Sequence, residues 1–364
     1  MVTGGHLSPA LAVIDRLIQE KNVKIVFVGR KYNLAGDRSE SLEYQEITKR
    51  KISFITLETG RAIKEISRRS LTDFFRTFQA LINSFILLIK VRPQRILSFG
   101  GYIAFPICLT GFILRIPVYT HEQTVHPGLA NRFIAKLSRK VFIAFSESRR
   151  FFPLKKTILT GNPIKRSVLT VNKVPFTIIR SKPVILVMGG SLGSHSINSI
   201  IGSILSELLK TYVVIHQTGS VTEYNDFQKL GYLKARLPKN LSKNYFLKKH
   251  FYDDELGSVY HISDLVVSRS GANTFFELLA LKKPAIFIPL PWSAYNEQEK
   301  HANLFQQAGA GEIFYQNQSP KLLLSLIRKV LTNVGKYREG FRNLNISDSD
   351  HAAETIVETV LYSS

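Results

Sequence analysis

The chain has 364 residues, of which 45% are hydrophobic and 21% charged, an ordinary composition for a globular protein. This length suits two domains of about 180 residues each. The formal net charge of +22 is unusual and implies an anionic partner: a nucleic acid, an anionic lipid surface or a phosphorylated substrate. The single cysteine, Cys108, excludes an internal disulfide framework and fits a reducing cytoplasm.

The basic residues are scattered through the chain, and no DNA-binding or RNA-binding signature accompanies them, so we expect no nucleic-acid partner. We also expect no secretory signal, because the chain opens directly with VTGGHLSP. Residues 96–114 carry no charge over 19 residues, which is long enough to cross a bilayer. Gly100, Gly101 and Pro106 favour a strand, a glycine turn and a buried helix there instead.

A glycine-rich turn at Thr3 to His6 opens the first half and leads into an amphipathic helix and a strand at residues 24–28. A Rossmann-like domain places such a turn after a central strand of about five residues. Only Met1 and Val2 precede Thr3. We therefore expect the natural start of the protein to lie upstream of Met1.

Residues 71–90 form a helix with a broad apolar stripe flanked by basic residues. The stripe contains Phe74, Phe75, Phe78, Leu81, Ile82, Phe85, Leu88 and Ile89, and the basic flanks contain Arg61, Lys64, Arg68, Arg69, Arg76, Lys90, Arg92 and Arg95. Two interpretations stay open. The helix faces the core of an α/β domain, or it also presents one edge to an anionic membrane surface.

The second half repeats the arrangement of the first, with a strand at Val184–Met188, a glycine loop at Gly189–Gly193 and an apolar-faced helix. We expect an N-terminal domain at 1–164, a linker at 165–183 and a C-terminal domain at 184–342. Residues 343–364 would form a polar stretch and a helix able to pack back on the N-terminal domain. Neither glycine loop reads G-x-G-x-x-G, so we expect no dinucleotide cofactor and predict none of another kind.

Residues 264–303 place the ingredients of a sugar-nucleotide site in one βαβ unit. A strand ends in a polar turn at Arg269–Asn273, and the helix that follows carries Glu277. Amides at the helix start attract phosphate, the carboxylate can hold ribose hydroxyls, and a later loop ending in Gln298 suits sugar hydroxyls. Alternatively, Thr274 and Glu277 form only a capping box, and the loop is simply solvated.

Six motifs occur in register along almost the whole chain. They are TGGHLSPALAV at the start, SFGGYIAFP at 98–106, HEQTVHPGLANR at 121–132, TGNPIKRSV at 160–168, GGSLGSHSIN at 189–198 and SRSGANTFFELLALKKPAIFIP at 268–289. Together they resemble the MurG family of peptidoglycan N-acetylglucosaminyltransferases. The resemblance implies a GT-B fold of the α/β class, with two Rossmann-like domains whose parallel sheets face a cleft. It also implies donor binding mainly by the second domain and a lipid acceptor approaching the first.

Carried over by position, the resemblance implies that His6 is the general base, Glu277 holds the ribose and Gln298 contacts the sugar. The backbone of Tyr252 would face uracil, and Ser191 would lie near the diphosphate. The implied substrate-binding set is Thr3, Gly4, Gly5, Thr124, Lys165, Ser191, Tyr252, Ala272, Asn273, Thr274, Phe275, Phe276, Glu277 and Gln298.

The chain departs from the family pattern at three positions. Thr124 stands where asparagine is usual, Leu192 where glutamine is usual, and Lys165 where arginine is usual. Lysine keeps the charge but lacks the guanidinium fork, so either Lys165 or the following Arg166 can serve the diphosphate.

The resemblance implies an inverting transfer of N-acetylglucosamine from UDP-N-acetylglucosamine to the muramyl 4-hydroxyl of undecaprenyl-linked lipid I, which gives lipid II. The enzyme would work peripherally on the cytoplasmic face of the cell membrane. Two alternatives remain: a diacylglycerol glycosyltransferase of the same fold, and a non-catalytic membrane-surface scaffold.

We expect no metal at this site. Lys165, Arg269 and backbone amides can oppose the charge of the leaving diphosphate. The paired acids Asp253 and Asp254 precede a helix, where they complement its dipole. His121 and Glu122 lack the second histidine of a zinc-binding helix and suit loop architecture or acceptor contact.

Overall fold

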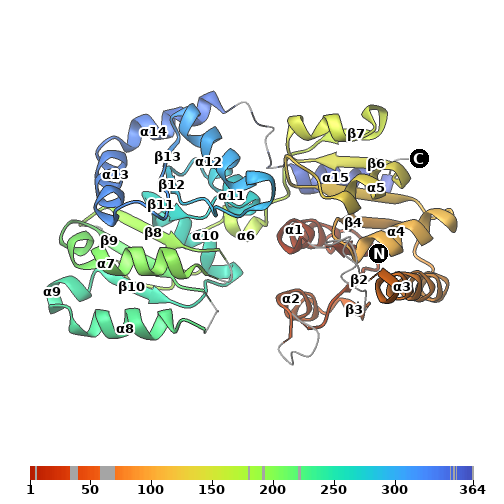
Figure 1. Ribbon diagram of the computed structural model, residues 1–364, viewed down its shortest axis with the longest axis horizontal. Helices are drawn as coiled ribbons and strands as arrows, with labels where there is room; N and C mark the ends of the chain where they lie inside the picture. The colour runs from red at the N-terminus through yellow and green to blue at the C-terminus, as the bar shows by residue number, and fades with distance from the viewer. Residues whose placement is uncertain are drawn as a thin grey trace. The chain divides into compact units, whose positions relative to one another are not determined.

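The computed structural model describes the chain in two units, Met1–Lys165 with Ile346–Ser364, and Arg166–Asn345 (Figure 1). The described residues are 1–362 except 5, 33–39, 58–69, 179–180, 191–192, 220–222, 345, 347–348 and 350, and no side chains are described at 4 and 70–77. Each unit has its own parallel sheet and its own hydrophobic core. This is the α/β, Rossmann-like architecture expected for each half of a GT-B protein.

The first unit is built on a seven-stranded parallel sheet with the order β3-β2-β1-β4-β5-β6-β7. Its strands are β1 (Val2–Gly4), β2 (Val26–Gly29), β3 (Ser53–Thr56), β4 (Ile96–Phe99), β5 (Val118–Glu122), β6 (Lys140–Ile143) and β7 (Thr157–Leu159). The strand order reverses between β1 and β4. Open parallel sheets bind ligands beyond the carboxyl ends of the strands at such a point.

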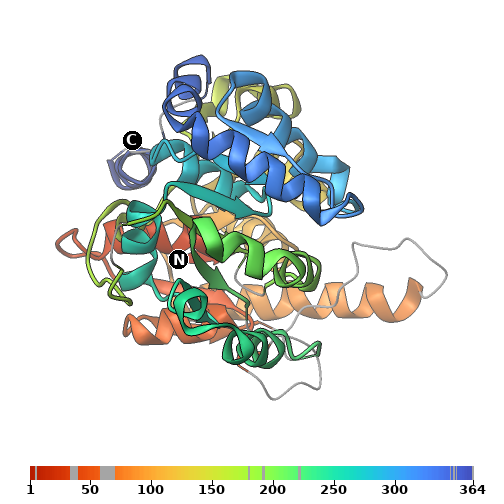
Figure 2. The ribbon, with the colours of Figure 1, turned by 90° about the vertical axis from the view of Figure 1, so that its left-hand side faces the viewer.

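Helices cover both faces of this sheet. They are α1 (Leu7–Leu17), α2 (Leu42–Lys49), α3 (Ser70–Val91), α4 (Ala104–Ile113), α5 (Leu129–Leu137) and α15 (Ala352–Tyr362), with short 3-10 helices at Ser146–Phe151 and Leu154–Lys156. The C-terminal helix α15 packs on α1, where Ile356 and Val357 join Val13 and Ile14 in one core cluster. Apolar side chains of α3, α4 and α5 join strand residues in a second cluster, with Leu88, Ile107 and Ile134 fully buried. Figure 2 shows α3 in profile as the long orange helix.

The uncharged stretch at 96–114 forms β4, a glycine turn and α4, which confirms the expected strand, turn and helix. The turn requires left-handed backbone, with φ of 76° at Gly100 and 82° at Gly101. Among the described residues, no helix is long and apolar enough to cross a membrane.

The second unit has a six-stranded parallel sheet with the order β10-β9-β8-β11-β12-β13, which reverses between β8 and β11. Its strands are β8 (Val184–Met188), β9 (Val213–Gln217), β10 (Tyr245–Lys248), β11 (Leu265–Ser268), β12 (Ala285–Phe287) and β13 (Gly311–Ile313). β8 occupies the residues expected for it. The sequence motifs after β8 and β11 therefore meet at the second switch point.

The helices of this unit are α6 (Arg166–Leu169), α7 (His195–Thr211), α8 (Asp226–Arg236), α9 (Lys239–Ser242), α10 (Asp253–Ile262), α11 (Ala272–Ala280), α12 (Glu297–Ala308), α13 (Pro320–Thr332) and α14 (Val334–Gly340), with 3-10 helices at Ala294–Asn296 and Phe341–Asn343. α7 and α13 bury their apolar faces in one cluster. α6, in the stretch expected to be a linker, packs on α10. There a Cβ at Gly257 would collide with the carbonyl oxygens of Ser167 and Thr170.

Candidate functional site

The turn after β1 brings Thr3 and His6 to the switch point of the first sheet. Thr3 is buried, and its hydroxyl has no hydrogen-bond partner among the described residues. Gly4 ends β1, and Gly5 lies outside the described residues. His6 is the N-cap of α1, with extended backbone and no side-chain capping bond, so its imidazole is not used to hold the helix start.

Gln123, from the loop after β5, holds the ring of His6. The carboxamide nitrogen lies 2.8 Å from His6 Nδ1, and Gln123 Oε1 is buried without a donor in the described part of the chain. Oxygen and nitrogen of an amide are assigned from the hydrogen-bond network, so the amide can equally present Oε1 to an Nδ1–H. That orientation leaves Nε2 with its lone pair, the form required of a base.

The electrostatic surroundings of His6 work in opposite directions. Burial lowers the pKa of His6, while the nearby carboxylate of Glu122 raises it. Because burial is the larger cause, His6 stays neutral at physiological pH and can accept a proton.

The carboxylate of Glu122 accepts hydrogen bonds from the loop after β5 and from α5. Oε1 accepts from the backbone N–H of Thr124 at 2.9 Å and from its hydroxyl at 2.7 Å, and Oε2 accepts from Asn131 Nδ2 at 2.9 Å. The hydroxyl of Thr120 donates to Asn131 Oδ1 at 2.6 Å. All four side chains are buried. This network fixes the loop that carries Gln123, and it occupies the Thr124 hydroxyl expected at the substrate.

His121 is buried beside this network and lies 3.3 Å from the carbonyl oxygen of Gly161 through Nε2. Burial lowers its pKa to about 3, so the ring is neutral and has an architectural place in the loop. Asp253 and Asp254 occupy the first turn of α10, where acidic residues complement the dipole, as expected. Within the described ranges, no group of three or more His, Cys, Asp or Glu side chains could hold a metal ion.

The glycine loop of the second unit follows β8 and leads into α7. Gly190 and Gly193 have φ of 88° and 90°, and a Cβ on Gly193 would collide with the carbonyl oxygen of Thr218. Glycine is therefore required at Gly193 for both conformation and space. Ser191 and Leu192, expected near the diphosphate, lie outside the described residues.

Helix α11 starts at the carboxyl end of β11 with Gly271 as its N-cap, and no side chain caps it. Thr274 is therefore the third residue of the helix, and the capping-box interpretation of Thr274 and Glu277 is wrong. The side chain of Glu277 is buried, and its Oε2 accepts a hydrogen bond from the Tyr260 hydroxyl at 2.8 Å. No motif or spacing in the sequence pointed to Tyr260.

The other α11 residues divide between helix start and core. The amides of Ala272, Asn273 and Thr274 belong to the first turn, which suits a phosphate group. Phe275 and Phe276 are fully buried, with Phe275 packed 5.0 Å from the ring of Phe305. Their side chains therefore serve the core.

Arg269 is hydrogen-bonded to several loops at the second switch point. Its Nη1 donates to the carbonyl oxygens of Ile288 and Pro289 at 2.9 and 3.2 Å. Its Nη2 lies within 3.0 Å of Ser194 Oγ, Ser196 Oγ and Gln316 Oε1. Burial lowers its pKa to about 10. Both amino groups are thus committed to protein oxygens, so the geometry makes Arg269 a brace between loops rather than the expected diphosphate ligand.

The remaining expected residues lie around these loops. Gln298 is in the first turn of α12, and its Oε1 accepts from the backbone N–H of Leu290 at 3.1 Å. Tyr252 is exposed at the N-terminus of α10, and its backbone N–H donates to Glu255 at 3.2 Å. Lys165 is the half-buried last residue of the first unit's main segment.

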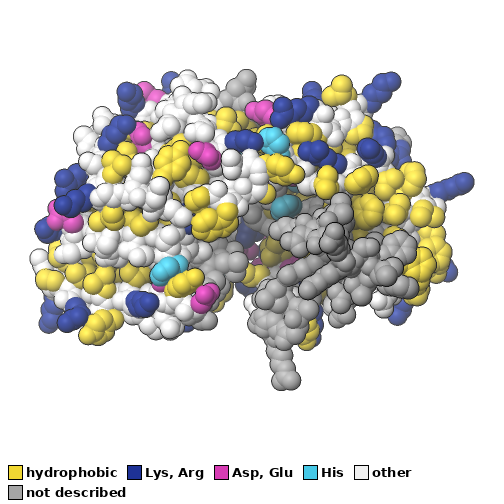
Figure 3. Space-filling view, in the orientation of Figure 1, with side chains coloured by type: hydrophobic (Ala, Val, Ile, Leu, Met, Phe, Trp, Pro, Cys, Tyr) yellow, Lys and Arg dark blue, Asp and Glu magenta, His cyan; other side chains and the backbone are white. Residues whose placement is uncertain are grey.

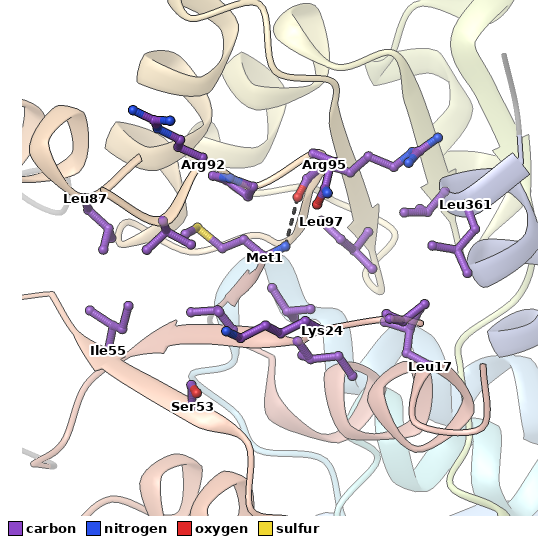
Figure 4. A pocket seen from close by; sticks show the side chains of 18 of the residues that line it. Met1, Leu17, Lys24, Ser53, Ile55, Leu87, Arg92, Arg95, Leu97 and Leu361 are labelled. Carbon is purple, nitrogen blue, oxygen red and sulfur yellow. Dashed lines mark hydrogen bonds between the residues drawn. The ribbon is translucent and has the colours of Figure 1, made fainter. Parts of the chain in front are cut away.

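A cavity of about 760 Å³ lies at the amino ends of the strands of the first sheet, the end opposite His6 (Figure 4). Its lining includes Leu17, Leu87 and Leu97, with Lys24 and Arg92 among its basic residues. Nucleotides bind at the carboxyl ends of parallel strands, so this cavity is not the expected substrate position.

Comparison with known proteins identifies both units. The model of the glycosyltransferase family 28 N-terminal domain matches residues 3–143, and that of the C-terminal domain matches residues 184–356. A Treponema denticola protein named UDP-N-acetylglucosamine--N-acetylmuramyl-(pentapeptide) pyrophosphoryl-undecaprenol N-acetylglucosamine transferase is 32% identical over 338 residues, which cover 90% of this chain and 85% of that protein. A Bacillus cereus transferase of the same name, numbered 2, is 29% identical and covers 98% of this chain and 96% of its own length.

Solved structures show the same fold. The crystal structure of Acinetobacter baumannii MurG aligns with a TM-score of 0.70 at 22% identity, covering 100% of this chain and 99% of that one. A UDP-GlcNAc 2-epimerase from Neisseria meningitidis aligns with a TM-score of 0.66 at 18% identity, covering 100% and 99%. Both family 28 domains and a near-full-length relative above 30% identity match, so the chain belongs to glycosyltransferase family 28, within its MurG group.

Proposed function

We propose that the protein transfers N-acetylglucosamine from UDP-N-acetylglucosamine to the muramyl 4-hydroxyl of undecaprenyl-linked lipid I, which produces lipid II for peptidoglycan. The observation that carries the proposal is the near-complete alignment with transferases named for this reaction, spanning both family 28 domains. The presence of His6, Glu277 and Gln298 at the positions that the resemblance implies supports a working enzyme.

In the proposed reaction, the muramyl hydroxyl oxygen attacks the anomeric carbon while the bond from that carbon to the UDP oxygen breaks. His6 Nε2 takes the hydroxyl proton, and UDP leaves with the bonding electron pair. Attack from the opposite face inverts the anomeric centre to the β-linkage. A positioned base typically contributes about 10²- to 10⁴-fold. The proposed acceptor contacts are the turn Thr3–Gly5, where the Thr3 hydroxyl has no partner within the described part of the chain, and the loop of Thr124.

The donor is proposed to bind the second unit. The amides of Ala272 to Thr274 and the loop of Ser191 would meet the diphosphate, and Lys165 or Arg166 would add positive charge. Phe275 and Phe276 would shape this turn from the core. Such preorganised donors stabilise the charge that develops on the leaving group.

Three further residues are proposed to recognise the rest of the donor. Glu277 would accept from the ribose hydroxyls, the backbone at Tyr252 would face uracil, and Gln298 would contact the sugar. Gln298→Ala should therefore relax the choice between N-acetylglucosamine and N-acetylgalactosamine donors. Unchanged discrimination in competition assays would remove that role.

A purified protein supplied with labelled UDP-N-acetylglucosamine and a short-chain lipid I analogue tests the activity. We expect a labelled disaccharide product, and none when diacylglycerol replaces lipid I. Transfer to diacylglycerol alone would favour the glycolipid enzyme, and no turnover with either acceptor would favour a non-catalytic scaffold.

We further propose that the helices α3, α4 and α5 form a membrane-facing surface on the cytoplasmic leaflet. Apolar side chains on them are 42–64% exposed, namely Phe78, Ile82, Phe85, Ile86, Ile89, Phe112, Ile113, Leu129 and Phe133. Residues 78–91, 104–113 and 129–137 contain no Asp or Glu, and Lys90, Arg92, Arg115 and Lys136 are exposed around them. Figure 3 shows hydrophobic and basic side chains gathered on the right of the view, where α4 and α5 lie in Figure 1.

The exposure of the α3 side chains bears on the two interpretations of residues 71–90, a core-facing helix or a helix with one edge toward the membrane. Leu88 faces the core, while Phe78, Ile82, Phe85 and Ile89 are exposed. The side chains of Phe74, Phe75 and Arg76 and the residues Arg61, Lys64, Arg68 and Arg69 lie outside the described set. Basic residues near an anionic surface contribute about 1 kcal/mol each. Binding to anionic vesicles should weaken as salt rises, and equal binding to neutral vesicles would remove the electrostatic contribution.

A further inference from the structure

The phenol of Tyr260 is hydrogen-bonded to Glu277, the carboxylate that we propose binds the ribose of the nucleotide. Tyr260 lies in the last turns of α10, and Glu277 lies in α11, with β11 between the two helices along the chain. The Tyr260 hydroxyl donates to Glu277 Oε2 at 2.8 Å. The ring of Tyr260 is fully buried, and the glutamate is 8% exposed.

A buried carboxylate loses its hydration and keeps its charge only where protein donors replace water. Tyr260 is such a donor across the whole physiological range, because burial and then the charge of Glu277 raise its pKa well above the ordinary value. A bond from a fixed ring also selects one orientation of the carboxylate. Orientation matters for ribose, because neighbouring hydroxyls on a rigid ring must meet their acceptor in a set geometry.

We propose that Tyr260 is a positioning residue for ribose recognition: its hydrogen bond orients Glu277 toward the 2′- and 3′-hydroxyls of a uridine diphosphate. This inference rests on the proposed ribose role of Glu277. On this proposal, Tyr260 and Glu277 together produce the preference for a ribonucleotide. Only Glu277 contacts the ligand. α6 packs closely on α10 at Gly257, three residues before Tyr260.

The test is calorimetric binding of UDP and of 2′,3′-dideoxy-UDP to the full-length protein. Tyr260→Phe removes one hydroxyl and keeps the ring. We expect about tenfold weaker UDP binding, the loss of roughly one hydrogen bond to a charged group, with unchanged binding of the dideoxy nucleotide. Calorimetry fits the affinity of the folded fraction separately from its amount, so reduced yield does not obscure the result.

The matched control is Tyr245→Phe, which also removes a buried hydroxyl, one that lies 2.9 Å from His216 Nδ1 in the same unit. It should leave the ratio of the two affinities unchanged. In a Glu277→Gln background, Tyr260→Phe should have no further effect on UDP, because the oriented carboxylate is already gone.

The outcomes separate the two ideas. If Glu277→Gln keeps the wild-type ratio of the two affinities, the ribose role of Glu277 fails, and the inference fails with it. If Glu277→Gln abolishes the ratio but Tyr260→Phe binds UDP like wild type, Tyr260 is not a positioning residue. Equal weakening of both nucleotides by Tyr260→Phe would show a purely structural role and overturn the inference.

Discussion

Each unit has a buried carboxylate in or after one of its central strands, and the hydrogen-bond donors around the two differ. Glu122 ends β5 and accepts three hydrogen bonds, two from Thr124 in the following loop and one from Asn131 in α5. Glu277 lies within α11 and accepts from Tyr260 on a neighbouring helix. The first carboxylate links β5, the following loop and α5, and the second links α11 to α10. The surrounding donors, rather than the strand-and-turn pattern, decide what each carboxylate does.

A second contrast concerns the amphipathic helices. α7 buries Ile197, Ile201 and Leu205 in the core of its unit. α3 has a comparable apolar periodicity but exposes Phe85 and Ile86. The same helical spacing thus serves a core in one unit and a surface in the other.

The largest effect should come from His6 in the first unit. His6→Ala removes the proposed base, and kcat should fall about 10²- to 10⁴-fold. UDP affinity should stay unchanged, because donor binding is assigned to the second unit. Steady-state transfer to a lipid I analogue, with calorimetric UDP binding as the control, measures both. A fall of only a few-fold would end the assignment of His6 as the base.

In the second unit, substitution of Arg269 should lower stability rather than kcat. Arg269→Met leaves the carbonyls of Ile288 and Pro289 without the donor that Arg269 Nη1 provides. We expect a loss of about 3 kcal/mol or more in the free energy of unfolding, measured by urea denaturation. The unfolding free energy of Arg269→Lys should lie between those of wild type and Arg269→Met, because lysine keeps the charge but lacks the two-pronged guanidinium group. Wild-type stability with lost UDP binding would instead make Arg269 a diphosphate ligand.

The proposed membrane role of α3, which α7 lacks, can be tested by replacing its exposed apolar side chains. Replacing Phe85 and Ile86 together by serine should weaken binding to anionic vesicles about tenfold, because apolar contact with the interface is lost. Tyr232→Ser removes an exposed aromatic side chain from the second unit and serves as the control. Co-sedimentation measures all three proteins. Equal binding by the double variant and wild type would place the membrane contact elsewhere.

The smallest expected effect is a pH shift at Gln123. Burial keeps the pKa of His6 below its ordinary value, so wild-type activity should be lost only when the pH falls below that lowered pKa. Gln123→Glu puts a carboxylate against Nδ1 and favours the protonated ring, which should move the acidic limb of kcat/KM to higher pH by about one unit. An unmoved limb would mean that Gln123 does not set the protonation of His6.

Gln123→Met gives the matched comparison. It keeps the length of the side chain but removes the acceptor, so kcat should fall without the upward shift of the limb. If Met and Glu variants behave alike, Gln123 acts only through packing.

The sequence by itself determined the elements and the family. The alternation of apolar strands, glycine turns and amphipathic helices is local, since backbone geometry and side-chain periodicity act over a few residues. It located β8 at Val184–Met188 and the strand, turn and helix at 96–114. The ordered motifs carried the family, and with it the expectations for His6 and Glu277.

Only the tertiary structure decided the partners of these residues. Gln123 meets His6 across 117 positions, and Arg269 braces residues from Ser194 to Gln316. Thr274 and Glu277 do not form the capping box that their spacing suggested, and Glu277 instead accepts a hydrogen bond from Tyr260. Hydrogen bonds and burial depend on which distant segments the sheet brings together, and a local pattern contains no record of that distance. The periodicity of α3 predicted an apolar stripe, but packing against α4 determined which of its side chains are buried and which are exposed.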